Sequence, residues 1–187
     1  MIEDIKAALD VLQKGGVILY PTDTIWGIGC DACNEEAVKK VYAIKNRIDS
    51  KSMLVLMGNA ALIERYVDEV PDIAYDLIEL TDKPLTIIFD GARSLAKNLI
   101  AEDGSIGIRI TTEKFSSELI RRFKRPIVST SANISGKPSP SCFDEIEPEI
   151  IDAVDYVVKY RQDDLQKAVP SGIIKLGRSG EIKIIRE

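Results

Sequence analysis

Apolar positions along the chain alternate between helical spacing and short unbroken runs. Ile5, Ala8 and Leu12 recur at the three- and four-residue intervals of a helix, and the glycines at 15 and 16 predict its end. The run 17–20 is apolar throughout, which is typical of a strand covered on both faces. The same alternation predicts strands at 53–57, 85–89, 105–110, 126–128, 156–158, 173–176 and 181–185, and helices at 34–45, 59–80 (two short ones separated at Pro71), 115–123 and 146–154.

Strands that alternate with helices in this way predict an α/β fold, and the terminal hairpin at 173–185 indicates a mixed sheet. Asn34 is placed to cap the helix that ends near Lys45, and Ile63 and Ile73 are expected among the inward positions of the two short helices. With 187 residues and 45% hydrophobic content, the chain is long enough for one sizeable core. We therefore expect a single domain spanning 1–187.

A dense group of small polar residues follows the predicted strand at 126–128. Ser129, Thr130, Ser131, Asn133 and Ser135 occupy five of seven positions. Their hydroxyl and amide groups can hold anionic oxygens without adding charge, and a loop after a strand is where an open α/β sheet binds its ligands. The alternative is an ordinary surface turn. A similar polar loop follows the strand at 17–20.

Cations are placed where they could meet such a ligand. Lys45, Arg47 and Lys51 fall within seven residues just before the strand at 53–57. Lysine and arginine are the usual partners of phosphate oxygens, although a short basic cluster is more often a solvated face. Arg109 lies inside a predicted strand, where it is either paired or an edge charge.

Composition limits the classes of function. The net charge of −5 does not favour a broad basic surface that binds nucleic acid. It does not exclude local basic patches. Glu3 and Asp4 precede any apolar run, unlike a secretory signal, and no stretch approaches the roughly 20 apolar residues of a membrane span. We expect a cytoplasmic protein that does not enter membranes.

The three cysteines and the absence of histidine restrict the chemistry. Cys30, Cys33 and Cys142 are too few for a closed zinc site without histidine. A redox dithiol at Cys30 and Cys33 is an alternative, and incidental reduced thiols are the favoured interpretation. Without histidine as a base, chemistry would rest on lysine, arginine, hydroxyls, backbone dipoles or a metal ion.

Several segments together resemble the YrdC-like family, whose members are L-threonylcarbamoyladenylate synthases. They are YPTDTIWGIG at 20–29, KNR at 45–47 and STSANISGKPSP at 129–140, with PLT at 84–86 and IGIRI at 106–110. The resemblance covers about 5–186, and the combination is specific where each motif alone is weak. It implies a twisted sheet with a concave, positively lined cavity. It also implies synthesis of threonylcarbamoyl-AMP and pyrophosphate from L-threonine, bicarbonate and ATP, for the threonylcarbamoyladenosine modification of tRNA at position 37.

The resemblance also implies roles for individual residues. Lys45 and Arg47 would act in catalysis. The residues implied for ATP and its phosphates are Lys45, Arg47, Ser129, Ser131, Asn133 and Arg186, and those implied for threonine are Thr24, Arg109 and Ser171. The chain departs from the family pattern at Ile48, Ser52, Leu56, 81–83 and Gly172.

The implied chemistry suits a site without histidine. A carbamate is already an anion that can attack the α-phosphorus, so the site needs positioning and charge relief from cations and from Mg²⁺ with the ATP. No protein metal site is expected. The implied partners are a downstream tRNA threonylcarbamoyl-transferase complex and, weakly, tRNA or double-stranded RNA.

Two alternatives remain at this level. One is a module that binds double-stranded RNA or tRNA, against which the acidic composition and the absence of an RNA-reading motif count. The other is a carbamoyl-adenylate-forming enzyme of hydrogenase maturation, whose accompanying zinc-finger and acylphosphatase regions this chain lacks.

Overall fold

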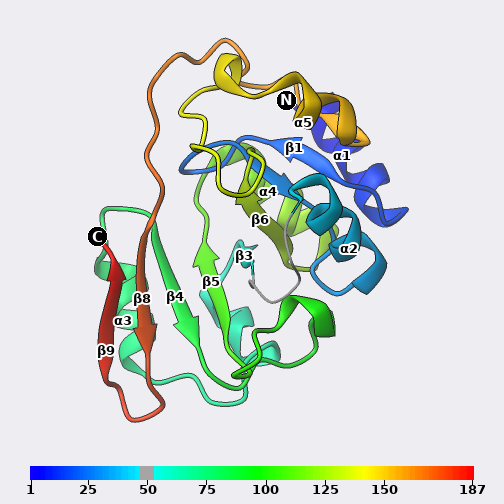
Figure 1. Ribbon diagram of the computed structural model, residues 1–187. Helices are drawn as coiled ribbons and strands as arrows, with labels where there is room; N and C mark the ends of the chain where they lie inside the picture. Colours follow the sequence, from blue (N-terminus) through cyan, green and yellow to red (C-terminus); the bar gives the residue numbers. More distant parts are fainter. Residues whose placement is uncertain (47–52) are drawn as a thin grey trace.

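The described strands form one mixed sheet (Figure 1). This computed structural model describes residues 1–46 and 53–187. The strand order is β7-β1-β2-β6-β3-β5-β4-β8-β9, in which β3–β5, β4–β8 and β1–β7 are parallel and the other neighbours antiparallel. The strands are β1 (Ile18–Tyr20), β2 (Gly27–Gly29), β3 (Leu54–Met57), β4 (Leu85–Phe89), β5 (Ile106–Ile110), β6 (Ile127–Ser131), β7 (Tyr156–Val157), β8 (Gly172–Leu176) and β9 (Ile182–Arg186).

Helices lie at both ends of the sheet, with α3 beside the β8–β9 hairpin and α1, α2 and α5 at the opposite end (Figure 1). Helix α1 packs against α4 and against β1, and α2 packs against η2. The α-helices are α1 (Ile2–Gln13), α2 (Glu35–Ile44), α3 (Ile73–Leu80), α4 (Lys114–Phe123) and α5 (Pro148–Ala153), and the 3₁₀ helices are η1 (Ala60–Arg65), η2 (Lys97–Leu99) and η3 (Phe143–Glu145). None of the helices in the described parts of the chain is long and apolar enough to cross a membrane.

The α/β class, the mixed sheet and the predicted elements are confirmed, with shifts of a few residues at their ends. The cap on α2 is also confirmed, because Asn34 Oδ1 accepts hydrogen bonds from the backbone N–H groups of Glu36 (3.0 Å) and Ala37 (3.1 Å). The helix ends at Ile44, with Lys45 as its C-cap.

Two expectations were wrong in detail. Ser129 to Ser131 belong to strand β6 and not to a loop, because they pair with β2 and β3 on its two sides. Ile73 begins α3 and is 38% exposed, so it is not an inward position. In addition, residues 27–29 form a strand that was not predicted, since glycine disfavours strands.

Glycine in β2 is explained by how closely its neighbours approach. A Cβ at Gly29 would lie 2.6 Å from Tyr20 Cε1 and 2.6 Å from the carbonyl oxygen of Val128. Tyr20 is fully buried and its hydroxyl donates to that same carbonyl (3.1 Å). Strands β1, β2 and β6 can therefore lie this close only while position 29 carries no side chain.

Candidate functional site

A cavity of about 320 Å³ opens on the middle of the sheet. Hydroxyl groups, two arginines and several apolar side chains line it, and its described lining contains neither aspartate nor glutamate. The lining residues are Thr24, Ile25, Trp26, Gly27, Met53, Leu54, Thr86, Ile88, Ser105, Gly107, Arg109, Ser129, Thr130, Ser131, Ser139, Pro170, Ser171, Ile173 and Arg186. The site thus offers hydrogen-bond donors and positive charge to a small anion.

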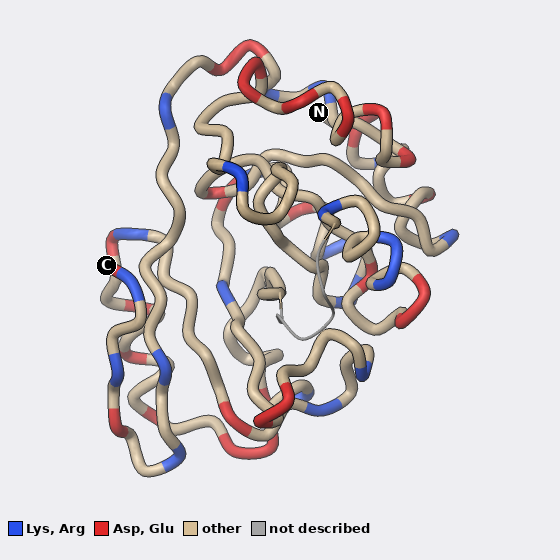
Figure 2. Tube along the Cα trace, viewed as in Figure 1, with Lys and Arg blue, Asp and Glu red and all other residues tan. Residues whose placement is uncertain are grey.

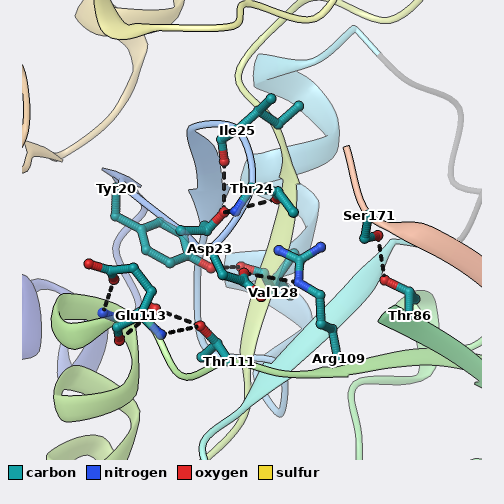
Figure 3. A network of polar contacts seen from close by, with 12 residues as sticks. Tyr20, Asp23, Thr24, Ile25, Thr86, Arg109, Thr111, Glu113, Val128 and Ser171 are labelled. Carbon is teal, nitrogen blue, oxygen red and sulfur yellow. Dashed lines mark hydrogen bonds and ion pairs between the residues drawn. The ribbon is translucent and has the colours of Figure 1, made fainter. Parts of the chain in front are cut away.

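Arg109 is the only charged residue in strands β1 to β6. Figure 2 shows how few charges lie along these central strands compared with the outer loops and helices. The side chain of Arg109 is 4% exposed, and its Nε donates to Asp23 Oδ1 at 3.1 Å. The terminal nitrogens of Arg109 make no hydrogen bond to any other residue that the structure describes. They remain available to a ligand, between Thr24 and the Thr86–Ser171 pair (Figure 3).

Burial raises the pKa of the Asp23 carboxyl, and the positive charge of Arg109 opposes this rise. Asp23 and Arg109 form an ion pair in a partly desolvated setting. Such a contact fixes the orientation of a guanidinium more firmly than a neutral one.

Thr24 is fixed by the loop between β1 and β2. The hydroxyl of Thr22 donates to the carbonyl of Ile25 (2.8 Å), so its oxygen accepts from the backbone N–H of Thr24 (3.0 Å) and from the hydroxyl of Thr24 (3.1 Å). The Thr24 hydroxyl thereby keeps its lone pairs for a donor group in the cavity (Figure 3).

Arg186 and Ser171 meet on the far wall of the cavity. Arg186 Nε and Nη2 donate to the carbonyl oxygen of Ser171 at 2.9 and 2.7 Å, and the hydroxyls of Ser171 and Thr86 lie 2.8 Å apart. Burial lowers the pKa of Arg186, and the nearby charge of Arg109 lowers it further. Two cations that repel each other across one cavity favour the binding of an anion between them.

The polar end of β6 supplies the opposite wall. Ser129 and Ser131 point to the same side of the strand, since side chains two residues apart share a face. A Cβ at Gly27 would lie 3.1 Å from Ser129 Oγ, so the glycine on β2 leaves room beside these hydroxyls.

Lys45 and Asn133 are not in the described lining of the cavity. Lys45 is 1% exposed, and its ammonium donates to the carbonyl oxygens of Ser131 (2.5 Å) and Asn133 (2.7 Å). The amide nitrogen of Asn133 donates to the carbonyls of Ile134 (3.1 Å) and Lys137 (2.7 Å), while its Oδ1 is buried and has no described partner. Both side chains hold the chain that follows β6, and their roles toward phosphate stay predictions. Arg47 and Ser52 lie outside the described residues.

Arg161 is a functional candidate that sequence reasoning missed. It lies in the segment that crosses from β7 to β8 (Figure 1), and its Nη1 donates to the carbonyl of Thr22 at 3.1 Å. It also pairs with Asp164 (3.0 Å) and approaches Glu113 (3.7 Å). The crossing segment is thus anchored to the loop that carries Thr24. No local pattern marks Arg161, whereas Asp23 and Thr86 could have been found inside the motifs at 20–29 and 84–86.

The cysteines do not form a reactive pair. Cys30, Cys33 and Cys142 are free thiols. Burial raises the pKa of Cys30, and it raises the pKa of Cys33 to about 11. Both groups are protonated thiols at neutral pH, unlike a redox dithiol, which needs a thiolate.

The described residues contain no group of three or more His, Cys, Asp or Glu side chains that could hold a metal ion. The hydroxyls of the cavity suit a magnesium ion that arrives on a polyphosphate, because Mg²⁺ commonly keeps phosphate and water oxygens as its ligands.

The fold and the site together define an α/β protein whose central cavity presents two guanidinium groups among hydroxyls. The sequence profile of the Sua5/YciO/YrdC family, described as "Telomere recombination", matches residues 10–187, and the chain belongs to this family. A protein of Methanocaldococcus jannaschii named "Putative threonylcarbamoyl-AMP synthase" is 39% identical over 190 residues, which cover 99% of this chain and 87% of that protein.

Solved structures show the same fold. P. abyssi Sua5 in complex with L-threonine has a TM-score of 0.83 and 25% identity, over 92% of this chain and 50% of that one. E. coli YciO has a TM-score of 0.84 and 24% identity, over 98% and 88%. The chain thus spans about half the length of the Sua5 structure and most of YciO.

Proposed function

We propose that this protein is an L-threonylcarbamoyladenylate synthase acting as a single YrdC-like domain over 1–187. It condenses L-threonine with bicarbonate and ATP, and releases threonylcarbamoyl-AMP, pyrophosphate and water. The observation that carries the proposal is one cavity containing Thr24, Arg109, Ser129, Ser131, Ser171 and Arg186, in a chain 39% identical to a relative named for this activity.

Threonine would bind on the Arg109 side of the cavity. The free terminal nitrogens of Arg109 suit the amino-acid carboxylate, since a guanidinium binds a carboxylate through two parallel hydrogen bonds. The hydroxyls of Thr24 and Ser171 flank this position and can meet the ammonium and hydroxyl groups of the substrate. That Sua5 was solved with L-threonine supports this class of ligand for the shared fold.

The triphosphate would bind along the end of β6 and toward Arg186. Ser129 and Ser131 supply hydroxyl donors there, Lys45 and Asn133 shape the chain that follows, and the KNR motif supplies Arg47. Magnesium enters as part of the MgATP substrate, where it would relieve charge on the phosphate oxygens.

The reaction needs no protein base for its adenylation step. The amine of threonine adds to carbon dioxide derived from bicarbonate and becomes a carbamate. A carbamate oxygen then forms a bond to the α-phosphorus while the bond to the β-phosphate oxygen breaks and pyrophosphate leaves. The protein contributes in-line positioning and cations near the departing pyrophosphate.

Pyrophosphate release measured with single omissions tests the proposal. We expect release only when threonine, bicarbonate and ATP are all present. Serine should be a poor substrate, because loss of one methyl contact costs roughly 10- to 200-fold in discrimination. Arg47→Ala should abolish release, and Thr24→Ala should raise the KM for threonine far more than that for ATP. Release that persists without threonine would overturn the assignment.

Carbamoyl phosphate separates this proposal from a carbamoyl-adenylate-forming enzyme of hydrogenase maturation. If it replaces threonine and bicarbonate together, the second activity is the correct one. The product of the proposed reaction would pass, in the cytoplasm, to a transferase complex that modifies tRNA. Binding of tRNA or double-stranded RNA by this chain itself would be weak.

A further inference from the structure

A second cavity, of about 500 Å³, lies at the other end of β3 from the first. Strand β3 begins at the first cavity with Leu54 and ends at the second with Met57. The second cavity is lined by η1, the C-terminal half of α4 and the residues just before β6, and none of its lining belongs to the proposed active site. Its lining residues are Met57, Gly58, Asn59, Leu62, Arg65, Tyr66, Ser117, Glu118, Ile120, Arg121, Lys124, Arg125 and Pro126.

The floor of this cavity is apolar. Met57, Ile120 and Pro126 are buried, and Leu62 and Tyr66 are half-buried beside them. Gly58 leaves the floor open, because a Cβ there would have nothing nearer than the carbonyl oxygen of Ser117 at 3.6 Å. A volume of several hundred cubic ångströms with an apolar floor is typical of a site that takes one apolar group.

Exposed cations form the rim of the cavity. Arg121 pairs with Glu118 at 2.6 Å, and Arg125 pairs with Asp31 at 2.8 Å. Arg65 and Lys124, by contrast, form no ion pair with any residue in 1–46 or 53–187. A chain with a net charge of −5 thus carries a local excess of positive charge around an apolar hollow.

The charges and the floor of the cavity together limit the kind of ligand that fits. A polyphosphate would meet the cations of the rim but leave the apolar floor uncovered. A peptide brings carboxylates for Arg65 and Lys124 and an apolar side chain for the floor.

We propose that this cavity binds an acidic segment of a partner protein, with one apolar side chain seated on Met57, Ile120 and Pro126 and flanking carboxylates on Arg65 and Lys124. This docking site is separate from the proposed active site and does not depend on the activity assigned to it.

Fluorescence anisotropy with three labelled heptapeptides tests the proposal on the full chain. The probe is Asp-Glu-Asp-Leu-Glu-Asp-Glu, one comparison replaces leucine by serine, and the other replaces every acidic residue by lysine. We expect the probe to bind at least about tenfold more tightly than either comparison, since affinity requires both the apolar anchor and the charges. Equal binding of the serine peptide, or tighter binding of the lysine peptide, would overturn the docking site.

Two variants place the binding in this cavity. The double variant Arg65→Glu/Lys124→Glu should lower the affinity for the probe peptide about tenfold or more. The control Lys83→Glu/Lys114→Glu, which reverses the charge of two exposed lysines elsewhere, should change this affinity less than about twofold. Gly58→Leu should fill the space above the floor and lower the affinity for the leucine peptide, while the affinity for the serine peptide stays unchanged. Circular dichroism verifies that each variant is folded.

Competition with inorganic tripolyphosphate separates a peptide site from a simple phosphate site. Displacement of the probe by tripolyphosphate at equal or lower concentration, lost in Arg65→Glu/Lys124→Glu, would replace the proposal with a polyphosphate site. Unchanged probe binding in that double variant would also overturn it.

Discussion

Asp23 Oδ1 and Arg109 Nε lie 3.1 Å apart and join the loop after β1 to the middle of β5. The pair is almost enclosed, since the two side chains are 12% and 4% exposed. It leaves the outer nitrogens of the guanidinium facing the cavity (Figure 3). Asp23 therefore acts on a ligand only through Arg109, as a positioning residue.

Asp23→Asn should raise the KM for threonine about tenfold and change the KM for ATP much less, because a neutral amide orients Arg109 less firmly than a carboxylate. Pyrophosphate release at varied threonine and varied ATP separates the two constants. Asp163→Asn, which removes an exposed carboxylate, is the matched control. Equal changes in both constants would point to a general structural defect and contradict the positioning role.

Lys45→Met should lower the free energy of unfolding by about 2 kcal/mol, because the buried carbonyls of Ser131 and Asn133 lose their donor. Urea unfolding measures the change, and Lys114→Met, at an exposed site, should leave stability nearly unaltered. A stable Lys45→Met protein would show that the two hydrogen bonds do not support the chain after β6.

Gly29→Ala should destabilise the protein by about 1 to 3 kcal/mol, because its methyl group would overlap both Tyr20 and the backbone of Val128. Gly172→Ala is the control in the same sheet, since a Cβ there would meet its neighbours only at 3.7 Å. Thermal unfolding of the two variants provides the comparison. Similar midpoints for both would mean that β1 and β6 can separate without cost.

Asp103 should make stability depend on pH in the acid range. Hydrogen bonds from Ser105 and Lys175 lower its pKa from 3.8 to about 2. The depressed pKa means that the contribution is complete above pH 3.8 and disappears as the pH falls toward 2. Asp103→Asn should therefore be less stable than the parent protein at pH 6, with a difference that shrinks between pH 4 and 2.

Urea unfolding across this pH range, with Asp152→Asn as an exposed control, measures the effect of Asp103. A difference that stays constant from pH 6 to 2 would show that the carboxylate makes no net contribution. The pH range lies outside that of most assays, so the measurement concerns stability alone.

The sequence predicts the elements of this fold well, because most of them have strong periodicity and clear ends. Asn34, for example, marks the start of α2 by a local cap. Strand β2 and the polar half of β6 could not be predicted in this way. Gly27–Gly29 and Ser129–Ser131 have the composition of loops and become strands only by pairing with each other and with their other neighbours.

The residues of the site could be predicted where they belong to sequence motifs. They could be predicted less well where tertiary contacts determine the position of a side chain. Thr24 and Ser171 were expected to bind threonine and Arg186 to bind ATP, and the structure places all three in the lining of one cavity. The contacts of the Lys45 ammonium with the carbonyl oxygens of Ser131 and Asn133 could not be predicted, because they depend on the path of the chain after β6. Arg161 escaped notice because the two residues through which it contacts the site, Thr22 and Glu113, are distant from it in sequence.

The crossing segment from β7 to β8 bears on the order in which the walls of the first cavity form during folding. Thr24 belongs to the start of the chain, whereas Ser171 and Arg186 reach the same cavity only after β8 has paired in parallel with β4. Parallel pairing across so long an intervening segment is slow, since loop closure precedes the contacts that reward it. A newly made chain can thus hold most of its core in place and still lack one wall of its binding site.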